Sequence, residues 1–323
     1  MKNNLRILLT STSFQDTPGR HHDLLNAQGF AIDTLRGPLS ADEILPVINK
    51  YDGIICGDDE LNGQVIKSGA NSKLKVISKY GIGLDKIDIS AAEEYGIPVI
   101  NCSGVNHVTV AEHVFALLLS YYKNIPKEVE FTKLGKWKRL IGHEIFGQTI
   151  GIAGLGRIGK EVAKRAIVFG LNILVYDLLI DEKFVSMNRI KIESSLERLF
   201  EKSDIVSLHM NLTSDNRHVV SKDLITNHTK RGLVLINTAR GDLVDLDALI
   251  YGLEKRILGA YLTDVLNKEP MPKDYSLRKY ENVLITPHIG SRTFESVERQ
   301  GIMAVENLIN ELKKGIKIKP LNV

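Results

Sequence analysis

The sequence lacks several features that would mark a specialised class of protein. It has only two cysteines in 323 residues, Cys56 and Cys102. Neither lies in a CxxC pair or near a histidine at ligand spacing, so neither a disulfide framework nor a metal site is expected. No apolar run approaches the roughly 20 residues that cross a bilayer. The N-terminus has no signal-peptide pattern. We therefore expect a cytoplasmic protein with reduced thiols and no membrane contact.

An excess of charge of one sign is also missing. The chain has 42 Lys and Arg against 39 Asp and Glu, a formal net charge of +3. A nucleic-acid surface would show clustered Lys and Arg, so no nucleic-acid partner is expected. With 43% hydrophobic and 25% charged residues, the composition is that of an ordinary globular protein. The length predicts two domains, because domains usually run to about 100–200 residues.

Short apolar runs alternate with helical patterns along the whole chain, which is typical of parallel α/β architecture. The amphipathic pattern from Phe294 to Leu312 predicts a final helix, and the pattern leaves open which domain this helix covers. Further helices are expected at 108–123, 160–169 and 246–254. The expected strands lie at 6–10, 53–56, 74–78, 98–101, 149–153, 172–176, 204–208, 233–236, 258–262 and 283–286.

A glycine-rich turn follows the expected strand 149–153. The run 154–159 reads GLGRIG and leads into a helix. Gly154 would permit the tight turn, Gly156 would let the backbone approach a pyrophosphate, and Gly159 would let helix and strand pack closely. The N-terminus of the helix would offer free N–H groups to the anion. This context predicts a dinucleotide-binding domain.

The next expected strand predicts which dinucleotide is bound. It ends in Asp177, 18 residues after Gly159, where an acid accepts hydrogen bonds from the ribose hydroxyls. Leu178 and Leu179 follow, with no arginine to receive a 2′-phosphate. The sequence therefore favours NAD over NADP.

Three downstream segments carry a family resemblance: INTARG at 236–241, GAYLTD at 259–264 running on to Glu269-Pro270, and TPHIG at 286–290. With them the chain resembles the D-isomer-specific 2-hydroxyacid dehydrogenases, and it is most similar to the phosphoglycerate dehydrogenase branch. The resemblance runs from about residue 50 to 315. Because the chain ends at Val323, we expect the short form without a C-terminal regulatory domain.

Three residues in these segments fit the chemistry that the resemblance implies. Oxidation of a 2-hydroxy acid requires removal of a hydride from C2 and of a proton from its hydroxyl group. His288 is expected to take that proton, and Glu269 to orient the ring and favour its protonated form. Arg240 is expected to bind the substrate carboxylate through two hydrogen bonds. We predict these three residues as the catalytic set.

The resemblance implies further contacts. In the first domain, a loop that includes Lys79, Gly81, Ile82 and Gly83 is similar to the family loop whose amides hold the substrate carboxylate, with Arg240 as the other substrate contact. The run 209–213, HMNLT, resembles the family's His-x-Pro-Leu-Thr with asparagine in place of proline. The implied cofactor contacts are Gly154, Gly156, Arg157, Ile158, Gly159, Asp177, Met210, Thr238, Ala239, Asp264, Gly290 and Ile82.

The substrate is a 2-hydroxy or 2-keto acid whose distal group the sequence leaves open. Lys79 would favour a phosphate, whereas Asp58-Asp59-Glu60 would repel one if these acids faced the cleft. They fit equally well as a solvated helix start. Phosphoglycerate is the leading single substrate, and glyoxylate or hydroxypyruvate is the alternative.

Two other functions remain open at this point. A formate dehydrogenase would share the scaffold, but formate has no hydroxyl proton to lose, so Glu269 argues against it. An NADH-sensing, corepressor-like binding protein could keep the whole catalytic set, and the motifs do not exclude it.

The resemblance also implies a fold and an assembly. Both domains are expected to be Rossmann-like α/β folds with parallel sheets. An NAD-binding domain, 104–289, would be inserted into a discontinuous flavodoxin-like substrate domain, 1–103 and 290–323, with the active site between them. The segment 108–147, which contains the only tryptophan, Trp137, resembles a dimerisation arm, so a homodimer is expected.

Overall fold

The computed structural model describes residues 5–313. These residues form two compact units. Unit 1 contains the described residues up to Asn106 and from Arg292, and unit 2 runs from His107 to Ser291. The chain therefore crosses between the units twice, at 106/107 and at 291/292. Residues 314–323, which the sequence assigns to the substrate domain, lie outside the described residues.

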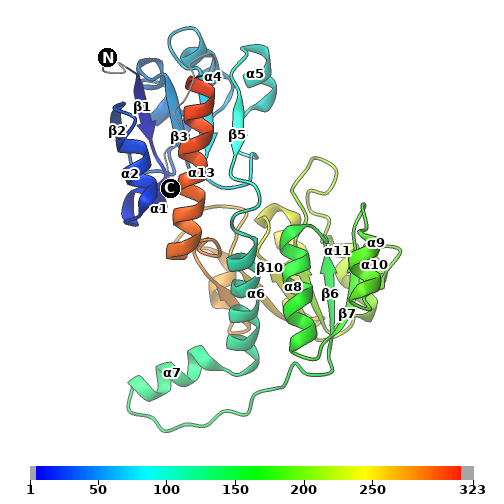
Figure 1. Cartoon of the computed structure of the whole chain (residues 1–323). Coiled ribbons are helices and arrows are strands. Elements are labelled where there is room, and N and C mark those ends of the chain that lie inside the picture. The colour runs from blue at the N-terminus through cyan, green and yellow to red at the C-terminus, as the bar shows by residue number, and fades with distance from the viewer. Residues whose placement is uncertain (1–4, 314–323) are drawn as a thin grey trace. The chain divides into compact units, whose positions relative to one another are not determined.

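Unit 1 is built on a parallel five-stranded sheet with the order β2-β1-β3-β4-β5; Figure 1 labels β1, β2, β3 and β5 of this sheet. This is the flavodoxin-like order that was expected from the resemblance. The sheet changes direction between β1 and β3, and parallel α/β folds bind ligands outside the carboxyl ends of strands at such a point. The strands are β1 (Arg6–Leu9), β2 (Ala31–Thr34), β3 (Gly53–Cys56), β4 (Val76–Lys79) and β5 (Val99–Asn101).

The last helix, α13 (Phe294–Leu312), belongs to unit 1. Its buried face, which includes Val305 and Leu308, packs against Ile7 and Val76 of the sheet. The Ser78 hydroxyl donates to the Ala304 carbonyl of this helix at 2.7 Å. The other helical segments of the unit are α1 (Thr12–Asp16), α2 (Arg20–Asn26), α3 (Ala41–Ile44), η1 (Ile48–Lys50), α4 (Gly63–Ala70) and α5 (Ile89–Glu94).

Unit 2 contains a parallel seven-stranded sheet with the order β12-β11-β10-β9-β6-β7-β8. From β8 inward this is the 3-2-1-4-5-6 order of dinucleotide-binding folds with one further strand, and its direction changes between β6 and β9. The fold class predicted from the sequence is confirmed in both units. The strands are β6 (Thr149–Ala153), β7 (Asn172–Tyr176), β8 (Lys191–Ile192), β9 (Ile205–Leu208), β10 (Leu233–Asn237), β11 (Leu258–Thr263) and β12 (Val283–Ile285).

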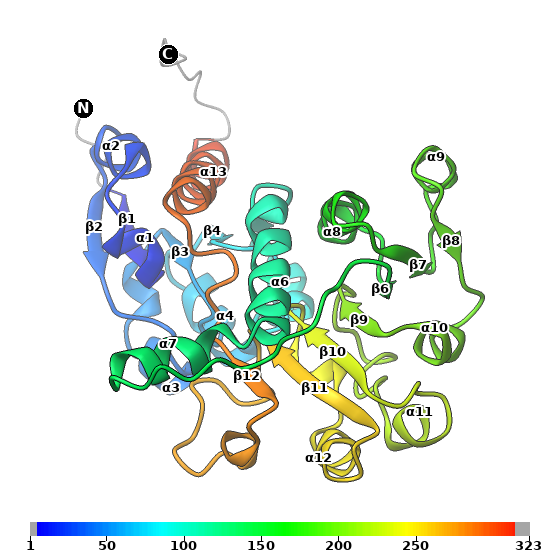
Figure 2. The same cartoon turned by 90° about the horizontal axis from the view of Figure 1, so that it is seen from below.

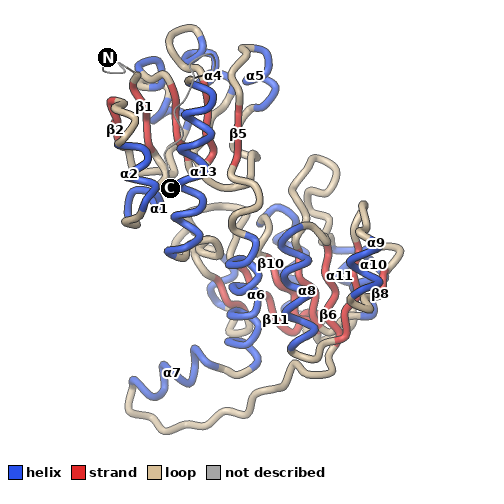
Figure 3. Tube along the Cα trace, viewed as in Figure 1, coloured by secondary structure: helices blue, strands red, loops and turns tan. Residues whose placement is uncertain are grey.

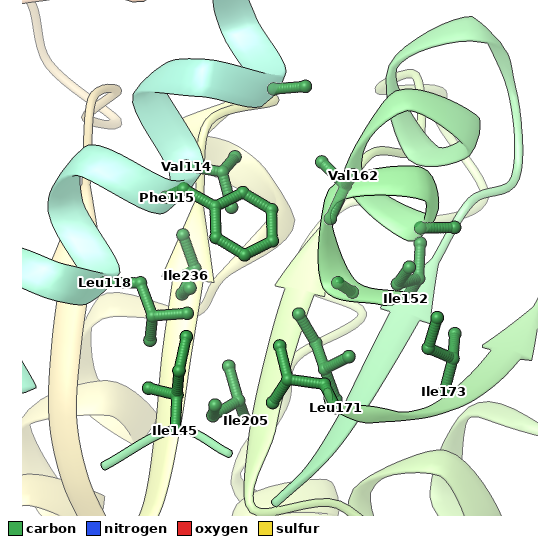
Figure 4. Close-up of a cluster of buried hydrophobic side chains, with 14 of the residues drawn as sticks. Val114, Phe115, Leu118, Ile145, Ile152, Val162, Leu171, Ile173, Ile205 and Ile236 are labelled. Carbon is green, nitrogen blue, oxygen red and sulfur yellow. The ribbon is translucent and has the colours of Figure 1, made fainter. Parts of the chain in front are cut away.

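Helices cover both faces of this sheet (Figure 2). On one face α6 (His107–Tyr122) and α8 (Arg157–Val168) bury Phe115, Leu118 and Val162 against Ile152 and Ile236 of the central strands (Figure 4). Each such side chain contributes about 1.5–3 kcal/mol through burial. A separate core on the opposite face involves α10 (Leu196–Lys202), α11 (Lys222–Asn227) and α12 (Leu246–Glu254). The unit also contains α9 (Glu182–Met187), η2 (Gly241–Leu243) and η3 (Ser276–Lys279).

A projecting segment follows α6. It consists of α7 (Ile125–Lys133), which has no buried residue, and a stretch drawn as loop that leads back to β6 (Figure 3). Its apolar side chains are largely in solvent, which is uncommon for so many large apolar groups in one segment. The exposed ones are Ile125, Val129, Leu134, Trp137, Ile141 and Phe146.

Within residues 5–313, no helix is long and apolar enough to cross a membrane. Cys56 and Cys102 are both free and buried. Burial raises the pKa of Cys56 to about 12 and that of Cys102 to about 11, so both stay protonated near neutral pH. Neither thiol therefore has the lowered pKa of a reactive cysteine.

Candidate active site

The glycine turn lies at the point where the unit 2 sheet changes direction. Gly154 follows β6 with a φ of 99°, a conformation that favours glycine. A Cβ at Gly159 would lie 2.0 Å from the Gly154 carbonyl oxygen, whereas a Cβ at Gly156 would meet nothing within 4 Å. Only Gly156 leaves its backbone open to a ligand. The helix begins at Arg157, three residues earlier than expected, so its free N–H groups belong to the motif itself.

Asp177 ties this turn to the end of β7. One carboxylate oxygen accepts a hydrogen bond from the Leu155 amide, and the other accepts from the Leu179 amide at 3.1 Å. The side chains of Leu178 and Leu179 are each 86% exposed. Asp177 is thus placed at the edge of the turn, with apolar groups rather than a cation directly after it.

Buried polar atoms without partners lie at the ends of the neighbouring strands. Among the described residues, Thr238 Oγ1 and His209 Nδ1 are closed to solvent and have no hydrogen-bond partner. Thr238 follows β10 and His209 follows β9, beside Gly154. Buried polar groups normally find partners. His209 lies beside the open glycine turn and Thr238 follows the next strand of the sheet, so both orphans are at strand ends where a polar dinucleotide would fit. Met210 lies in the same place, with its amide 3.0 Å from a Cβ built on Gly154.

Arg240 is held at the carboxyl end of β10 by a buried asparagine. Asn237 donates to the Arg240 carbonyl at 2.8 Å, and its own side-chain oxygen accepts from the Ala239 amide at 3.1 Å. The guanidinium group donates to the Ala239 carbonyl at 2.7 Å. A Cβ at Gly241 would lie 2.0 Å from the backbone of Leu266. The Arg240 turn therefore packs directly against the loop that leads to Glu269.

Glu269 and His288 form a direct pair. The imidazole Nδ1–H donates to Oε2 of Glu269 at 2.8 Å, since an ionised carboxylate only accepts. The other carboxylate oxygen accepts from the Leu266 amide at 2.7 Å. Both side chains are about a third exposed. The carboxylate is thus fixed at both oxygens, and it holds the ring so that Nε2 is the nitrogen that can exchange a proton with a substrate.

Asp264 is nearly fully buried and binds the loop that bears His288. Its carboxylate accepts from the amides of Ile289 and Gly290 at 2.8 and 2.7 Å. Its backbone carbonyl accepts from the His288 amide at 2.9 Å. The structure therefore brings Arg240, Glu269, His288, Asp264 and Gly290 together at one edge of unit 2.

The predicted substrate residues of unit 1 lie at the carboxyl end of β4. Lys79 is 3% exposed, and its ammonium group donates to the Gly57 carbonyl at 2.6 Å and to Asp58 at 2.8 Å. Gly81 has a φ of 116°. The Ile82 carbonyl accepts from Asn101 at 2.8 Å, and Gly83 follows it in this partly buried turn.

The three acids after β3 have separate roles. Asp59 is fully buried and accepts from Thr10 and from the amides of Leu39 and Gly57. Glu60 accepts from the Ala41 amide at the start of α3. Only Asp58 pairs with Lys79, and its side chain is 54% exposed.

Comparison with known proteins identifies the family to which this geometry belongs. The model of the D-isomer specific 2-hydroxyacid dehydrogenase NAD binding domain matches residues 115–290. The chain belongs to the D-isomer-specific 2-hydroxyacid dehydrogenases. The predicted family, enzyme class and NAD cofactor are thereby confirmed, and the relatives include the phosphoglycerate dehydrogenases of the predicted branch.

The relatives of this dehydrogenase are named for several different substrates. It is 38% identical to a hydroxypyruvate reductase of Thermotoga maritima, over 85% of this chain and 89% of that relative. It is 38% identical to a glyoxylate reductase of Thermofilum pendens, over 85% and 83%. A D-3-phosphoglycerate dehydrogenase of Archaeoglobus fulgidus is 33% identical over 92% of this chain but only 56% of its own length. This dehydrogenase therefore spans little more than half of that last relative.

Solved structures agree with this membership. The TT0316 protein from Thermus thermophilus is 33% identical, with a TM-score of 0.86 over 96% of this chain and 97% of its own. A D-lactate dehydrogenase from Aquifex aeolicus, complexed with NAD and lactic acid, is 27% identical, with a TM-score of 0.83 over 95% and 96%.

Three residues of this dehydrogenase's site were not singled out from the sequence. Asn237 fixes the Arg240 turn, while Thr286 and His113 contact Asp264. Thr286 stands two residues before His288, and that proximity was the one available signal. His113 lies on α6, 175 positions away from His288 in the sequence, so only the fold brings it to this loop.

Proposed function

We propose that this dehydrogenase interconverts a small 2-keto acid and its D-2-hydroxy acid, with Arg240, Glu269 and His288 as its catalytic residues. The observation that carries the proposal is the fixed Glu269 carboxylate, which is held by the Leu266 amide on one side and bound to the His288 ring on the other. A carboxylate in that place fixes the orientation of the ring through Nδ1, so that Nε2 can serve as the acid of a keto-acid reductase.

In this mechanism the Gly154–Gly159 turn, Asp177, Met210, Thr238 and Ala239 would hold NADH, with Arg157 and Ile158 at the helix start. NADH, when bound, supplies the hydride for C2 of the substrate. His288 donates its Nε2 proton to the C2 oxygen, and Glu269 keeps the ring oriented through Nδ1. Arg240 binds the substrate carboxylate and draws electron density from the C2 oxygen. In the oxidative direction the same nitrogen accepts the proton.

Replacement of the histidine tests these roles. His288→Ala should lower kcat for reduction by about 10²–10⁴, the usual contribution of a general acid, with the Kd for NADH within about threefold of wild type. The matched control is His228→Gln, because His228 pairs with Glu201 elsewhere on unit 2. Unchanged turnover in His288→Ala would refute the assignment. A wild-type chain that binds NADH but reduces no 2-keto acid would instead support a corepressor-like binding protein.

We further propose hydroxypyruvate or glyoxylate as the substrate rather than a phosphorylated acid. Lys79 is buried and already compensated by Asp58, so a phosphate at this edge of unit 1 would meet paired charge and an exposed carboxylate. The names of the two 38% identical relatives support the same choice. Phosphohydroxypyruvate remains the second candidate, because a cation stands at Lys79 and other relatives are phosphoglycerate dehydrogenases.

A substrate panel separates these candidates. We expect kcat/KM with NADH to be higher for hydroxypyruvate or glyoxylate than for phosphohydroxypyruvate. Asp58→Asn should then raise kcat/KM for phosphohydroxypyruvate about tenfold, since removal of one partly exposed charge changes the energy of a nearby anion by about 1–2 kcal/mol. Glu60→Gln removes the same charge two residues away and should have little effect. If phosphohydroxypyruvate is the best substrate of the wild type, the preference proposed here is wrong.

We also propose that the 108–147 segment joins two copies of the chain. The support is the row of exposed apolar groups on and after α7, with Trp137 at 84% and Ile141 at 94% exposure. Sedimentation at micromolar concentration should give twice the 36.0 kDa chain mass, and Trp137→Glu combined with Ile141→Glu should shift it toward the monomer. A monomeric wild type would contradict this proposal.

A further inference from the structure

A chain of three side chains connects α6 to the loop that bears His288. His113 on α6 lies 2.9 Å from the Thr286 hydroxyl through Nε2. That hydroxyl donates its single proton to Oδ1 of Asp264 at 2.6 Å. The Thr286 oxygen must therefore accept from His113, which assigns a proton to Nε2 of that ring. The same Nε2 lies 3.3 Å from Oδ1 of Asp264.

The carboxylate at the end of this chain organises the turn on both sides of the reacting histidine. Oδ1 of Asp264 accepts from the Ile289 amide and Oδ2 accepts from the Gly290 amide. A Cβ at Gly290 would lie 2.9 Å from Oδ2 and 3.5 Å from the His113 ring. The two groups thus fit closely around a residue that has no side chain, and this close fit leaves the turn little freedom to shift.

The turn needs such support because His288 has a φ of 54°. A residue with a side chain rarely adopts the left-handed region, and such a conformation persists only where surrounding contacts hold it. The contacts that hold it here are the amide hydrogen bonds to Asp264 and the bond from the His288 amide to the Asp264 carbonyl. If the carboxylate moves, the backbone of His288 can relax.

Asp264 is suited to this role because it remains an acceptor. Burial alone would raise its pKa, but the hydrogen bonds from His113, Thr286 and the two amides outweigh burial and lower the pKa below its usual value. His113 is 16% exposed and Asp264 is 3% exposed, so their contact is sheltered from competing water. A surface histidine whose ring formed hydrogen bonds only with water would have no need of a buried carboxylate as its partner.

We propose that His113 is a positioning residue: through Thr286 it fixes the Asp264 carboxylate, and this carboxylate holds His288 in the conformation in which it faces substrate. The inference rests on the proposed role of His288 and adds a residue that acts without touching substrate or cofactor. His113 and Thr286 are part of one hydrogen-bonded unit, so loss of either should have the same consequence.

The test uses paired variants of the full chain. Thr286→Val removes the hydroxyl at nearly constant shape, and His113→Phe removes the donor while keeping a ring. Each should lower kcat for keto-acid reduction about tenfold, since small displacements of reacting groups are costly, and this effect should exceed any change in the Kd for NADH. Thr286→Ser keeps the hydroxyl and should retain most of the wild-type kcat. Glu112→Gln is the matched control on α6, because Glu112 pairs with Arg165 outside this chain of contacts.

Two further readouts separate positioning from general destabilisation. With NADH deuterated at the transferred position, the isotope effect on kcat should rise in Thr286→Val and His113→Phe, because a misplaced acid slows the chemical step. Hydrogen exchange in a peptide that covers 286–291 should quicken in these two variants and not in Glu112→Gln, since the Ile289 and Gly290 amides lose a fixed acceptor.

Each of the following results would overturn either the positioning role of His113 or the proposed function. Unchanged exchange in both variants overturns the proposal whatever the kinetics, and quicker exchange with wild-type kcat overturns the positioning role. A Thr286→Ser variant as slow as Thr286→Val also overturns it, because the hydroxyl would then be irrelevant. If the wild type reduces no 2-keto acid, the proposed function fails by itself, and the exchange experiment still decides whether His113 holds the loop.

Discussion

Replacement of Gly159 by alanine should damage both the fold and cofactor binding. The new Cβ would lie 2.0 Å from the Gly154 carbonyl oxygen and 3.1 Å from its carbon. Ordinary contact needs about 3.4 Å or more, so α8 must move away from the turn by about 1.4 Å. Overpacking of this kind costs about 1–3 kcal/mol, against a gain of at most about 1 kcal/mol from the higher helix propensity of alanine. We expect a net loss of up to about 3 kcal/mol in the free energy of unfolding.

The same movement should weaken NADH binding, because the first amides of α8 leave the position in which they meet the pyrophosphate. Loss of one or two hydrogen bonds to a charged group, each worth about 1.5–3 kcal/mol, raises the Kd for NADH by at least about tenfold. Titration of NADH fluorescence measures this Kd, and urea unfolding without cofactor measures stability.

Gly156→Ala provides the matched control. Gly156 has a φ of −67°, which alanine adopts readily, and the added Cβ would meet no protein atom within 4 Å. Its stability should be unchanged or slightly higher, whereas its NADH affinity should fall because the methyl group occupies the space through which the pyrophosphate approaches. If Gly159→Ala unfolds and binds NADH like wild type, or if Gly156→Ala binds NADH normally, the division of roles between these glycines is wrong.

Three other substitutions have defined outcomes. Asp177→Ala should raise the Kd for NADH about tenfold by loss of the ribose acceptor and narrow the preference for NADH over NADPH, and equal affinities before and after would contradict this. Burial lowers the pKa of His209 to about 3. As the pH falls below about 6.5, this histidine therefore binds a proton in the unfolded chain but not in the native chain, and the free energy of unfolding declines. His209→Gln should therefore lose about 2 kcal/mol less than wild type between pH 7 and pH 5 in urea unfolding; an unchanged pH slope would show that His209 is not responsible. Asn237→Ala should lower kcat about tenfold because the Arg240 carbonyl loses its donor. Steady-state kinetics with a 2-keto acid would show this loss, and an unchanged kcat would contradict it.

The central strands of both sheets could be predicted because they are apolar on both faces. The expected strand 233–236 is extended by one residue in β10, and strands 149–153 and 172–176 match β6 and β7. The edge strands β2 and β8 were not predicted. β2 is at most half-buried and β8 has two exposed residues, so neither has the apolar run that marks a central strand. Whether a segment forms an edge strand depends on the one strand with which it pairs rather than on its own composition.

Helix α13 shows a different limit of the sequence. Its amphipathic pattern predicted a helix and an apolar face, but the sheet that this face covers is determined by packing partners far away in the sequence. Ser78 and Val76 of β4 are such partners, more than 200 residues before Ala304. Helix α7 was not predicted for another reason: it has no buried face to produce an amphipathic pattern.

Asp58, Asp59 and Glu60 show why local charge is a poor guide to what a substrate encounters. As a sequence they form a block of three negative charges, yet in the structure each has a different environment. Asp59 is buried among backbone donors and the Thr10 hydroxyl, and Glu60 lies against the first turn of α3. Only Asp58 faces a cation, and it compensates the very residue, Lys79, that argued for a phosphate. Lys79 and one of these three acids thus form an ion pair that is close to neutral, whereas Asp59 and Glu60 are bound by backbone amides and not by this cation. Substrate selection at this edge should therefore depend on the exposure of Asp58 rather than on the number of acids in the sequence.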